Sequence, residues 1–293
     1  RTNGYFVIAP KDRGLVDTPA NSSRNALRSA LFYQPSQQSI LTTRLEYFAE
    51  DRDNGTALRK NDTNITRLRG SYRRKDAEGR EWQIRAYGLN EKFDSSFTAV
   101  SSNRQLEFLV KEQQIPVKSA GSSAQWTGSL GTQHLMTSGV DWQWVRGNSE
   151  ELSYWSRKPM RSQVVGGTQQ FGGFYLQDLV SINQRLHLQL GARFDAWSNY
   201  DARRNEVSLT TGIPSNLVFE SRGGSTISPR TGASFHFNEE LTLRGAFYRS
   251  FRAPTLNELY RGFRVGKVTT IANEKLKPER LNGVETGLDW DLG

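Results

Sequence analysis

Alternation of apolar and polar residues is the feature that most limits how this chain can fold. The clearest stretch lies between Leu186 and Trp197. One set of alternate positions holds Leu186, Leu188, Leu190, Ala192, Phe194 and Ala196. The other set holds His187, Gln189, Arg193 and Asp195. A period of two places neighbouring side chains on opposite faces of a β-strand, so this stretch is predicted to be a strand with one apolar and one polar face.

Charged residues in mid-strand decide between the folds that this alternation allows. Arg193 and Asp195 lie inside one such strand, and Arg244 lies inside another at 241–250. In a β-sandwich the polar face would be the core, and each unpaired buried charge would cost on the order of several kcal/mol. A water-filled or plugged barrel removes that cost. The sequence therefore predicts an all-β protein, a transmembrane antiparallel up-and-down β-barrel.

The same pattern divides the chain into strands and connections. Strands are predicted at 4–9, 23–34, 39–50, 63–75, 81–93, 119–130, 134–146, 169–181, 186–198, 227–237, 241–251 and 283–292. Long loops are predicted at 10–22, 51–62, 94–118, 147–168, 199–226 and 252–282, with short turns between the other pairs. Short periplasmic turns opposite longer extracellular loops are typical of outer-membrane barrels.

Composition removes several other classes of protein. No run of about 18 apolar residues occurs, which excludes a transmembrane helix. There are no cysteines, so neither a disulfide framework nor a thiolate metal site is expected. The net charge of +9 comes from basic residues scattered over the chain rather than gathered in a stripe, so no nucleic-acid partner is expected.

Motifs of catalysis are missing as well. The three histidines, His134, His187 and His236, fall on different predicted strands and have no triad or zinc-protease spacing. The sequence therefore predicts no enzyme activity, no catalytic residue and no cofactor.

The stretch from Phe247 to Gly287 carries a family resemblance in four linked pieces. They are Phe251-Arg252-Ala253-Pro254, Asn257-Glu258-Leu259-Tyr260, Leu276-Lys277-Pro278-Glu279, and finally Glu285 with Gly287. In wording and order these pieces resemble the late barrel region of TonB-dependent outer-membrane receptors. In that family a barrel of about 22 strands surrounds a plug.

The resemblance implies a function and a set of partners. It implies that residues 1–293 are a barrel-domain fragment, about 12 strands of the larger barrel, without the plug domain that engages TonB. The expected function is TonB-energised uptake of a scarce nutrient, a siderophore-type metal chelate or a cobalamin-like ligand. The expected place is the outer membrane of a Gram-negative bacterium, in contact with lipopolysaccharide and outer-membrane lipid.

Two predicted loops hold the candidate ligand-binding residues, because aromatic rings beside cationic groups suit anionic or aromatic ligands. Loop 147–168 supplies Tyr154, Trp155 and Arg157. The long loop after Arg252 supplies Asn257, Glu258, Tyr260, Arg261, Arg264 and Lys267, with Arg252 itself. The alternative interpretation is that these residues are solvated loop surface or bind lipopolysaccharide phosphates.

A protein-bound metal is not expected to hold the ligand. No histidine lies between Pro254 and Asn273, where haem receptors of the resembled family carry one, although Tyr260 could in principle substitute. The oxygen-rich turn Asp51–Gly55 has the ligand type of calcium but not the spacing of an EF-hand. We therefore expect a ligand that brings its own metal or none.

Two other functions remain open at this level. One is a passive outer-membrane channel or structural barrel without an energised step. The other is a soluble β-propeller binding module, since hairpins recur at roughly the spacing of kelch blades. A plug with a TonB-binding segment would favour the receptor, and extraction only into detergent would exclude the propeller.

Overall fold

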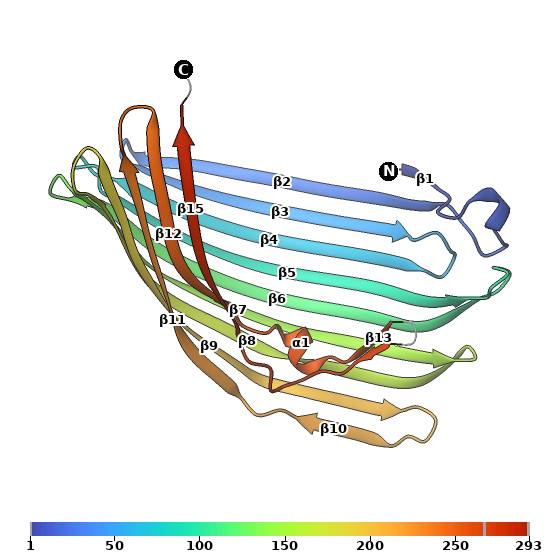
Figure 1. The fold of residues 1–293 in the computed structure, drawn as a ribbon. Helices are drawn as coiled ribbons and strands as arrows, with labels where there is room; N and C mark the ends of the chain where they lie inside the picture. Colours follow the sequence, from blue (N-terminus) through green and yellow to red (C-terminus); the bar gives the residue numbers. More distant parts are fainter. Residues whose placement is uncertain (1, 266–267, 292–293) are drawn as a thin grey trace.

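The computed structural model describes residues 2–265 and 268–291, and one antiparallel sheet dominates it (Figure 1). The sheet contains thirteen strands that follow one another almost in chain order. They are β1 (Thr2–Tyr5), β2 (Ala20–Ser36), β3 (Ser39–Asp53), β4 (Lys60–Lys75), β5 (Glu81–Val100), β6 (Glu107–Leu130), β7 (His134–Trp155), β8 (Lys158–Ser181), β9 (Leu186–Ser208), β10 (Pro214–Val218), β11 (Arg222–His236), β12 (Leu241–Arg252) and β15 (Glu279–Trp290).

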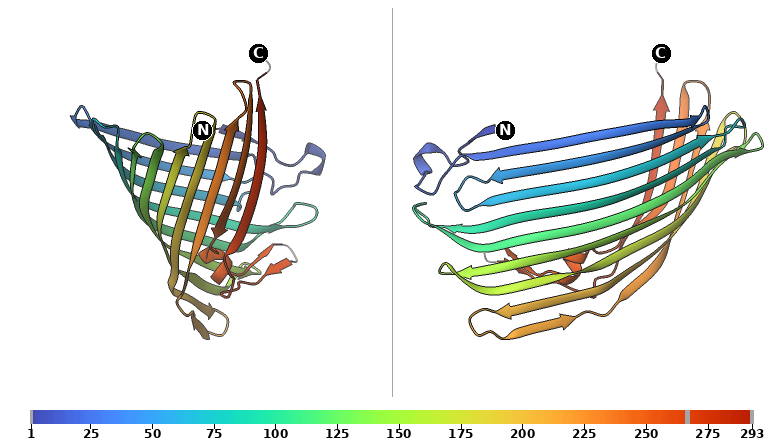
Figure 2. Two further views of the ribbon diagram at one scale, coloured as in Figure 1. Left: turned by 60° about the vertical axis from the view of Figure 1, so that its left-hand side comes forward. Right: turned by 180° about the vertical axis from the view of Figure 1, so that it is seen from behind.

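The sheet is strongly curved and does not close in the described residues. β1 and β15 stand at its two ends, and Figure 2 shows these ends apart, with β15 turned across the direction of β2. β10 and β11 share one edge of β9 in succession: β11 pairs with 186–199 and β10 with 203–207. The predicted meander is confirmed, but the sheet has thirteen strands where twelve were expected, because β10 lies within the predicted loop 199–226.

Register across the sheet separates an apolar from a polar face. Val140, Phe174, Phe194 and Ile227 stand side by side on four neighbouring strands, and each is about half exposed on the outer, convex side. One position further along, Asp141, Gly173 and Asp195 line up on the inner, concave side. The alternation that predicts the strands thus reports the two faces of this sheet correctly.

The strands run well past the apolar band, and here the predicted loops 94–118 and 147–168 are wrong. β5 and β6 are joined only by residues 101–106, so most of the predicted loop 94–118 is strand. β7 and β8 are joined by a two-residue turn, Ser156 and Arg157, in place of the predicted loop 147–168. The outward positions beyond Trp144 are Arg146, Asn148 and Glu150. Both faces are polar there, so the alternation disappears although the backbone pairing continues.

The Ser156–Arg157 turn has a conformation that is unusual for its residues. Both residues have positive φ, 48° and 64°, as in the tightest hairpin turns. Glycine and asparagine normally occupy such positions, because other side chains disfavour the left-handed region. The sequence therefore gives no signal of this turn.

Within residues 2–265 and 268–291, helical structure is confined to two short pieces. A 3-10 turn, η1, covers Pro10–Asp12, and α1 covers Leu256–Tyr260. Among the described residues no helix is long and apolar enough to cross a membrane. A second, two-stranded sheet consists of β13 (Phe263–Val265) and β14 (Val268–Thr270).

Candidate functional site

The candidate site is the part of the concave wall that faces residues 253–278, which we call the inner segment. It connects β12 to β15, whose adjoining residues Arg252 and Glu279 are register partners. The segment holds α1, β13 and β14, and Figures 1 and 2 show it on the concave side of the sheet. α1 packs against β8 and β9. The predicted loop 252–282 is therefore a folded element that covers the inner wall.

Local sequence explains why a helix begins at Leu256. Thr255 is the N-cap: its hydroxyl accepts a hydrogen bond from the backbone N–H of Glu258. The carboxylate of Glu258 accepts one in return from the Thr255 backbone N–H at 2.8 Å. Such a capping box satisfies two amides that the first helical turn leaves without partners, and an N-cap contributes about 1 kcal/mol. Five residues are still too few for a stable isolated helix, so packing must hold α1 in place.

An ion cluster fixes the entrance and exit of the inner segment. The guanidinium of Arg252 donates to Glu258 at 2.9 Å and to Glu279 at 2.6 Å. The hydrogen bond from Arg252, followed by those from Thr255, lowers the pKa of Glu258 to about 2. The same arginine lowers the pKa of Glu279. All of these groups remain partly open to solvent, so the cluster positions the segment more than it stabilises it.

Apolar contacts hold α1 to the wall. Leu259 and Tyr260 are 2% and 1% exposed and form a cluster with Val165 of β8 and Ala202 of β9. The Tyr260 ring centroid lies 4.7 Å from that of Phe219. Full burial of a large apolar side chain contributes about 1.5–3 kcal/mol, so this cluster is the main attachment of the helix. The Tyr260 hydroxyl has no hydrogen-bond partner among the described residues.

A buried carboxylate provides the second attachment. Glu151 of β7 accepts a hydrogen bond from Arg261 Nε at 2.7 Å, and Lys111 Nζ lies 3.3 Å from its other oxygen. Gln113 and Ser149 donate to the same carboxylate at 3.1 and 3.0 Å. Burial by itself raises the pKa of Glu151, but the hydrogen bond and charge of Arg261 and the charge of Lys111 outweigh it and lower the pKa. Glu151 is therefore an anion that the surrounding donors stabilise.

A third attachment links the segment to β8. The side-chain amide of Gln169 donates to the Pro254 carbonyl at 2.9 Å and to the Asn199 side chain at 2.8 Å. Gln169 and Asn199 are both buried. Gln169 of β8 thus links Pro254, which lies just before α1, to Asn199 of β9. This link fixes where along the strands the inner segment is attached.

The ligand-binding residues predicted after Arg252 are brought together, and most of their polar groups have partners in the chain. Arg252 and Glu258 bind each other, Tyr260 is buried, and Arg261 binds Glu151. Asn257 accepts a long hydrogen bond, 3.3 Å, from Arg261. The backbone of Arg264 belongs to β13, but its side chain, like all of Lys267, lies outside the described part of the chain.

The three candidates of the β7–β8 hairpin lie apart from the inner segment, at the tip of the strands. Tyr154 donates to Glu112 at 2.5 Å, and this hydrogen bond raises the pKa of the phenol to about 12. Trp155 is 74% exposed, and Arg157 stacks 5.7 Å from the Phe108 ring while remaining exposed. Of these three candidates, Trp155 and Arg157 are thus the ones with free surface.

Glu151, Gln169 and Gln113 are functional candidates that sequence reasoning does not find. They lie where alternation is lost, and their partners are far away in the chain; Glu151 and Arg261 are 110 residues apart. No motif marks such a pair.

Nearer the middle of the strands, the concave wall carries an ion bridge that spans three strands. Arg193 of β9 contacts Asp195 on its own strand and Asp141 on β7, both at 2.6 Å. Gly173 of β8 lies between the two aspartates, and a Cβ there would come within 2.0 Å of the guanidinium. The glycine therefore opens the path along which the arginine crosses its neighbour strand.

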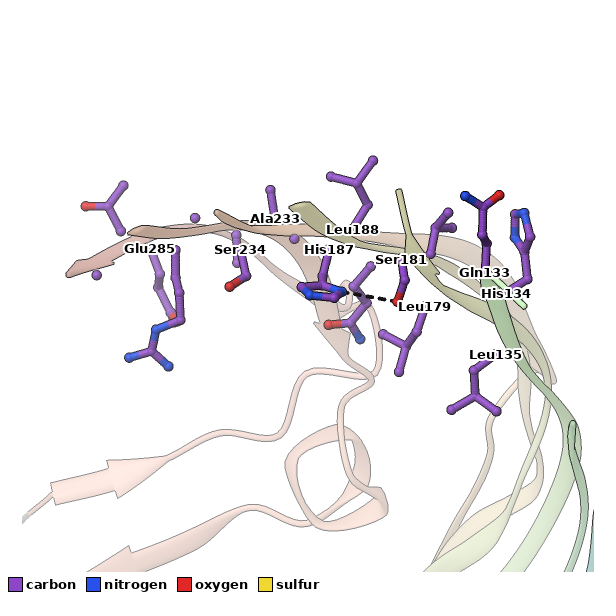
Figure 3. A pocket seen from close by; sticks show the side chains of 18 of the residues that line it. Gln133, His134, Leu135, Leu179, Ser181, His187, Leu188, Ala233, Ser234 and Glu285 are labelled. Atoms are coloured by element: carbon purple, nitrogen blue, oxygen red, sulfur yellow. Dashed lines mark hydrogen bonds between the residues drawn. The ribbon is translucent and has the colours of Figure 1, made fainter. Parts of the chain in front are cut away.

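At the short-turn end, a hollow on the concave side is lined by polar and apolar residues of several strands (Figure 3). His187 points to the concave side and contacts the Ser181 hydroxyl at 3.1 Å, whereas Leu188 points the opposite way. His134 lies on the outer side and contacts Asp178 at 2.6 Å. The described residues contain no group of three or more acidic or histidine side chains placed to hold a metal ion. In the oxygen-rich turn Asp51–Gly55, the Asp53 carboxylate accepts a hydrogen bond from the Asn21 side chain at 2.8 Å.

The family described as "TonB dependent receptor-like, beta-barrel" matches residues 9–293. Among solved structures, the copper transporter OprC superposes with a TM-score of 0.70 at 12% identity, over 94% of this chain and 44% of that one. The ferric-catecholate import receptor Fiu of E. coli K12 gives 0.70 at 13%, over 93% and 49%. The ferric yersiniabactin uptake receptor FyuA of Yersinia pestis gives 0.68 at 9%, over 95% and 45%.

The chain thus spans less than half the length of each of these structures, and identities this low show the fold alone. No curated protein matches the chain.

Proposed function

Because the chain belongs to the TonB-dependent receptor β-barrel family, we propose that it forms part of an outer-membrane receptor that imports a scarce small-molecule nutrient with energy from TonB. The proposed ligand is an anionic metal chelate or a cobalamin-like molecule. TonB would act through a plug domain inside the barrel, and the proposal includes no catalytic step by this chain.

The observation that carries the proposal is the inner segment on a polar concave wall. A passive pore needs only a wettable wall, whereas here a folded element covers part of it and is attached by a buried ion pair and four apolar side chains. An element of this kind narrows the lumen where a ligand would pass. The similar structures include a copper transporter, a ferric-catecholate import receptor and a ferric yersiniabactin uptake receptor, which supports a metal or metal-chelate class of ligand.

Within this proposal, first contact with the ligand falls to Trp155 and Arg157. An exposed indole and guanidinium at a hairpin tip offer stacking and charge to an anionic chelate. The polar groups of Arg252, Asn257, Glu258, Tyr260 and Arg261, and the undescribed side chains of Arg264 and Lys267, would come into play only deeper in the lumen. There Arg252, Glu258 and Arg261 would have to exchange their present partners for the ligand.

The test is uptake by cells that depend on the native-length protein. Radiolabelled or fluorescent cargo should be drawn from a panel of iron-loaded catecholate, iron-loaded hydroxamate, ferric citrate, cobalamin and haemin. We expect uptake of one of these to require both the receptor and TonB, and to fall when Trp155→Ala and Arg157→Ala are combined. The matched control is Lys158→Ala, which removes a neighbouring exposed cation. Uptake that persists without TonB would favour a passive channel.

The soluble β-propeller does not agree with the structure. A propeller consists of separate four-stranded blades, whereas the strands here form one continuous thirteen-stranded sheet.

A further inference from the structure

We propose that Lys118 and Arg146, on the outer face of β6 and β7, form a binding site for the phosphate group of a lipid in the outer leaflet. This inference rests on the outer-membrane location proposed above but not on the identity of the imported ligand. It concerns the convex surface of the sheet, which the uptake site does not use.

The first observation is a cross-strand pair of like charges. Lys118 and Arg146 are direct register partners, so their Cβ atoms are about 4.5–5.5 Å apart. Both side chains are exposed, and within the described part of the chain neither is joined to a carboxylate. Like charges placed directly opposite destabilise a sheet. A bound anion between the two side chains would reverse the sign of this interaction.

The second observation is the height of the pair on the barrel wall. Its outward neighbours toward the short-turn end are Ala120 and Trp144, which are also register partners. Trp142 follows on the same face and is 43% exposed. Tryptophans gather where the apolar interior of a bilayer meets the headgroups. Lys118 and Arg146 stand one outward step beyond them, about 7 Å along the strand, at the level of headgroup phosphates.

The orientation of the strands assigns the leaflet. β6 and β7 are joined near the apolar band by residues 131–133, and the other ends of both strands extend far beyond Arg146. Outer-membrane barrels turn close to the bilayer on the periplasmic side and project their longer connections on the extracellular side. The pair therefore faces the outer leaflet.

The chemistry of the two side chains favours a phosphate. Arg146 offers a planar fork of donors that matches two phosphate oxygens, and Lys118 adds a compact point charge. Further out on the same face are the carboxylates of Asp94 and Glu150, with Lys92 paired to Asp94 at 3.1 Å. These carboxylates repel an anion on the extracellular side of the pair. The apolar band on the periplasmic side of the pair accepts acyl chains. A phosphorylated lipid anchored in the bilayer meets both conditions.

The experiment compares lipids on the purified native-length protein in detergent. Native mass spectrometry should count bound molecules of bisphosphorylated lipid A, dephosphorylated lipid A and phosphatidylcholine. We expect binding of the bisphosphorylated lipid alone, weakened about fivefold by Lys118→Gln or Arg146→Gln and ~25-fold by both, since each basic residue near an anionic surface contributes about this much. The charge-conserving Lys118→Arg and Arg146→Lys should bind as the parent does.

The matched control is Arg85→Gln, which removes one exposed cation from the concave face. Equal binding of dephosphorylated lipid A by the parent would overturn the proposal, and so would an equal loss in the Arg85 variant. Displacement of the lipid by millimolar inorganic phosphate would show a site for free phosphate and would also overturn it. If the double variant does not fold, the comparison of the three lipids on the parent still decides. Uptake measured separately distinguishes failure here from failure of the proposed function.

Discussion

Arg261 reaches the carboxylate of Glu151 across 110 residues of sequence, with 2.7 Å between Nε and Oε1. Both side chains are largely buried, and the pair joins the inner segment to the wall. Breaking a buried ion pair by removing one partner leaves a charge without compensation. The pair is therefore the natural point at which to test whether the segment is attached as described.

We expect Arg261→Ala to loosen the inner segment without unfolding the sheet. Loss of one partner of a buried pair costs about 3–5 kcal/mol, and the lower figure applies because Lys111 remains near Glu151. Amide hydrogen exchange of residues 255–261 should accelerate, while exchange in β8 and β9 should not. The control is Lys277→Ala, an exposed cation of the same segment. Unchanged exchange in the Arg261 variant would show that the apolar contacts alone hold α1.

Acid should weaken the attachment through Glu258. Its pKa is lowered from 4.5 to about 2, so its contribution is complete above pH 4.5 and is lost as the pH falls toward 2. Between these values Glu258 is still an anion in the docked segment but takes up a proton when the segment undocks, so acid favours the undocked state. Hydrogen exchange at Thr255 and Glu258, corrected for the intrinsic effect of pH, should rise in this window. Glu258→Gln should show fast exchange at pH 7 and little further change on acidification.

Leu190→Arg tests the outer face. Leu190 is 48% exposed on the convex side, and an arginine near the midplane of a bilayer costs about 2–4 kcal/mol on a barrel's lipid face. The free energy of unfolding from lipid bilayers should fall by this amount in the native-length protein. The control is Gln189→Arg, one residue away on the polar face, which should cost far less. Equal losses in the two variants would contradict the assignment of faces.

Gly173→Ala should break the bridge between Arg193 and Asp141. The added Cβ would fall within 2.0 Å of the guanidinium, so the arginine must move. A hydrogen bond to a charged group contributes about 1.5–3 kcal/mol, and we expect a loss of this size in unfolding free energy. Gly172→Ala is the matched control, because its nearest atom, the Asp141 carbonyl oxygen, is 3.9 Å away. A destabilisation by Gly172→Ala as large as that by Gly173→Ala would remove the bridge as the cause.

Substitutions of Tyr260 distinguish a role in packing from a role in ligand contact. Its hydroxyl is buried and has no partner in the described residues, so Tyr260→Phe should leave the attachment of α1 unchanged or strengthen it. Tyr260→Ala removes a ring that is 1% exposed and should cost about 3–5 kcal/mol. Hydrogen exchange of α1 reports both. If Tyr260→Phe instead lowers uptake while α1 stays protected, the hydroxyl acts on the ligand. A haemin Soret shift lost in the same variant would identify it as an iron ligand.

The sequence predicts the fold where the two sides of the sheet differ in polarity. Leu190 and Arg193 fall on opposite faces as expected, because a lipid-facing and a lumen-facing side leave a period of two. Beyond Trp144 both sides are polar, and the signal is lost although β7 continues to Trp155. For this reason the sequence predicts loops where the strands in fact continue.

The site was only partly predictable. The motif from Arg252 to Tyr260 marks a real element, and its Thr255–Glu258 spacing is that of a capping box. The burial of Tyr260 and the pairing of Arg261 with Glu151 depend on which strands the inner segment meets. The curvature of the sheet, and not the local sequence, determines which strands these are. A candidate list made from residue types therefore contains structural and exposed residues alike.

The pairing of Arg252 with Glu279 closes the inner segment into a loop with both ends fixed. An undocked α1 therefore stays near Val165 and Ala202, at an effective concentration of about millimolar for a short tether. Any molecule that binds to this part of the wall must compete with α1. Because α1 belongs to the same chain, dilution does not weaken this competition. When such a molecule leaves, the segment returns in a first-order step, whatever the concentration of receptor or cargo.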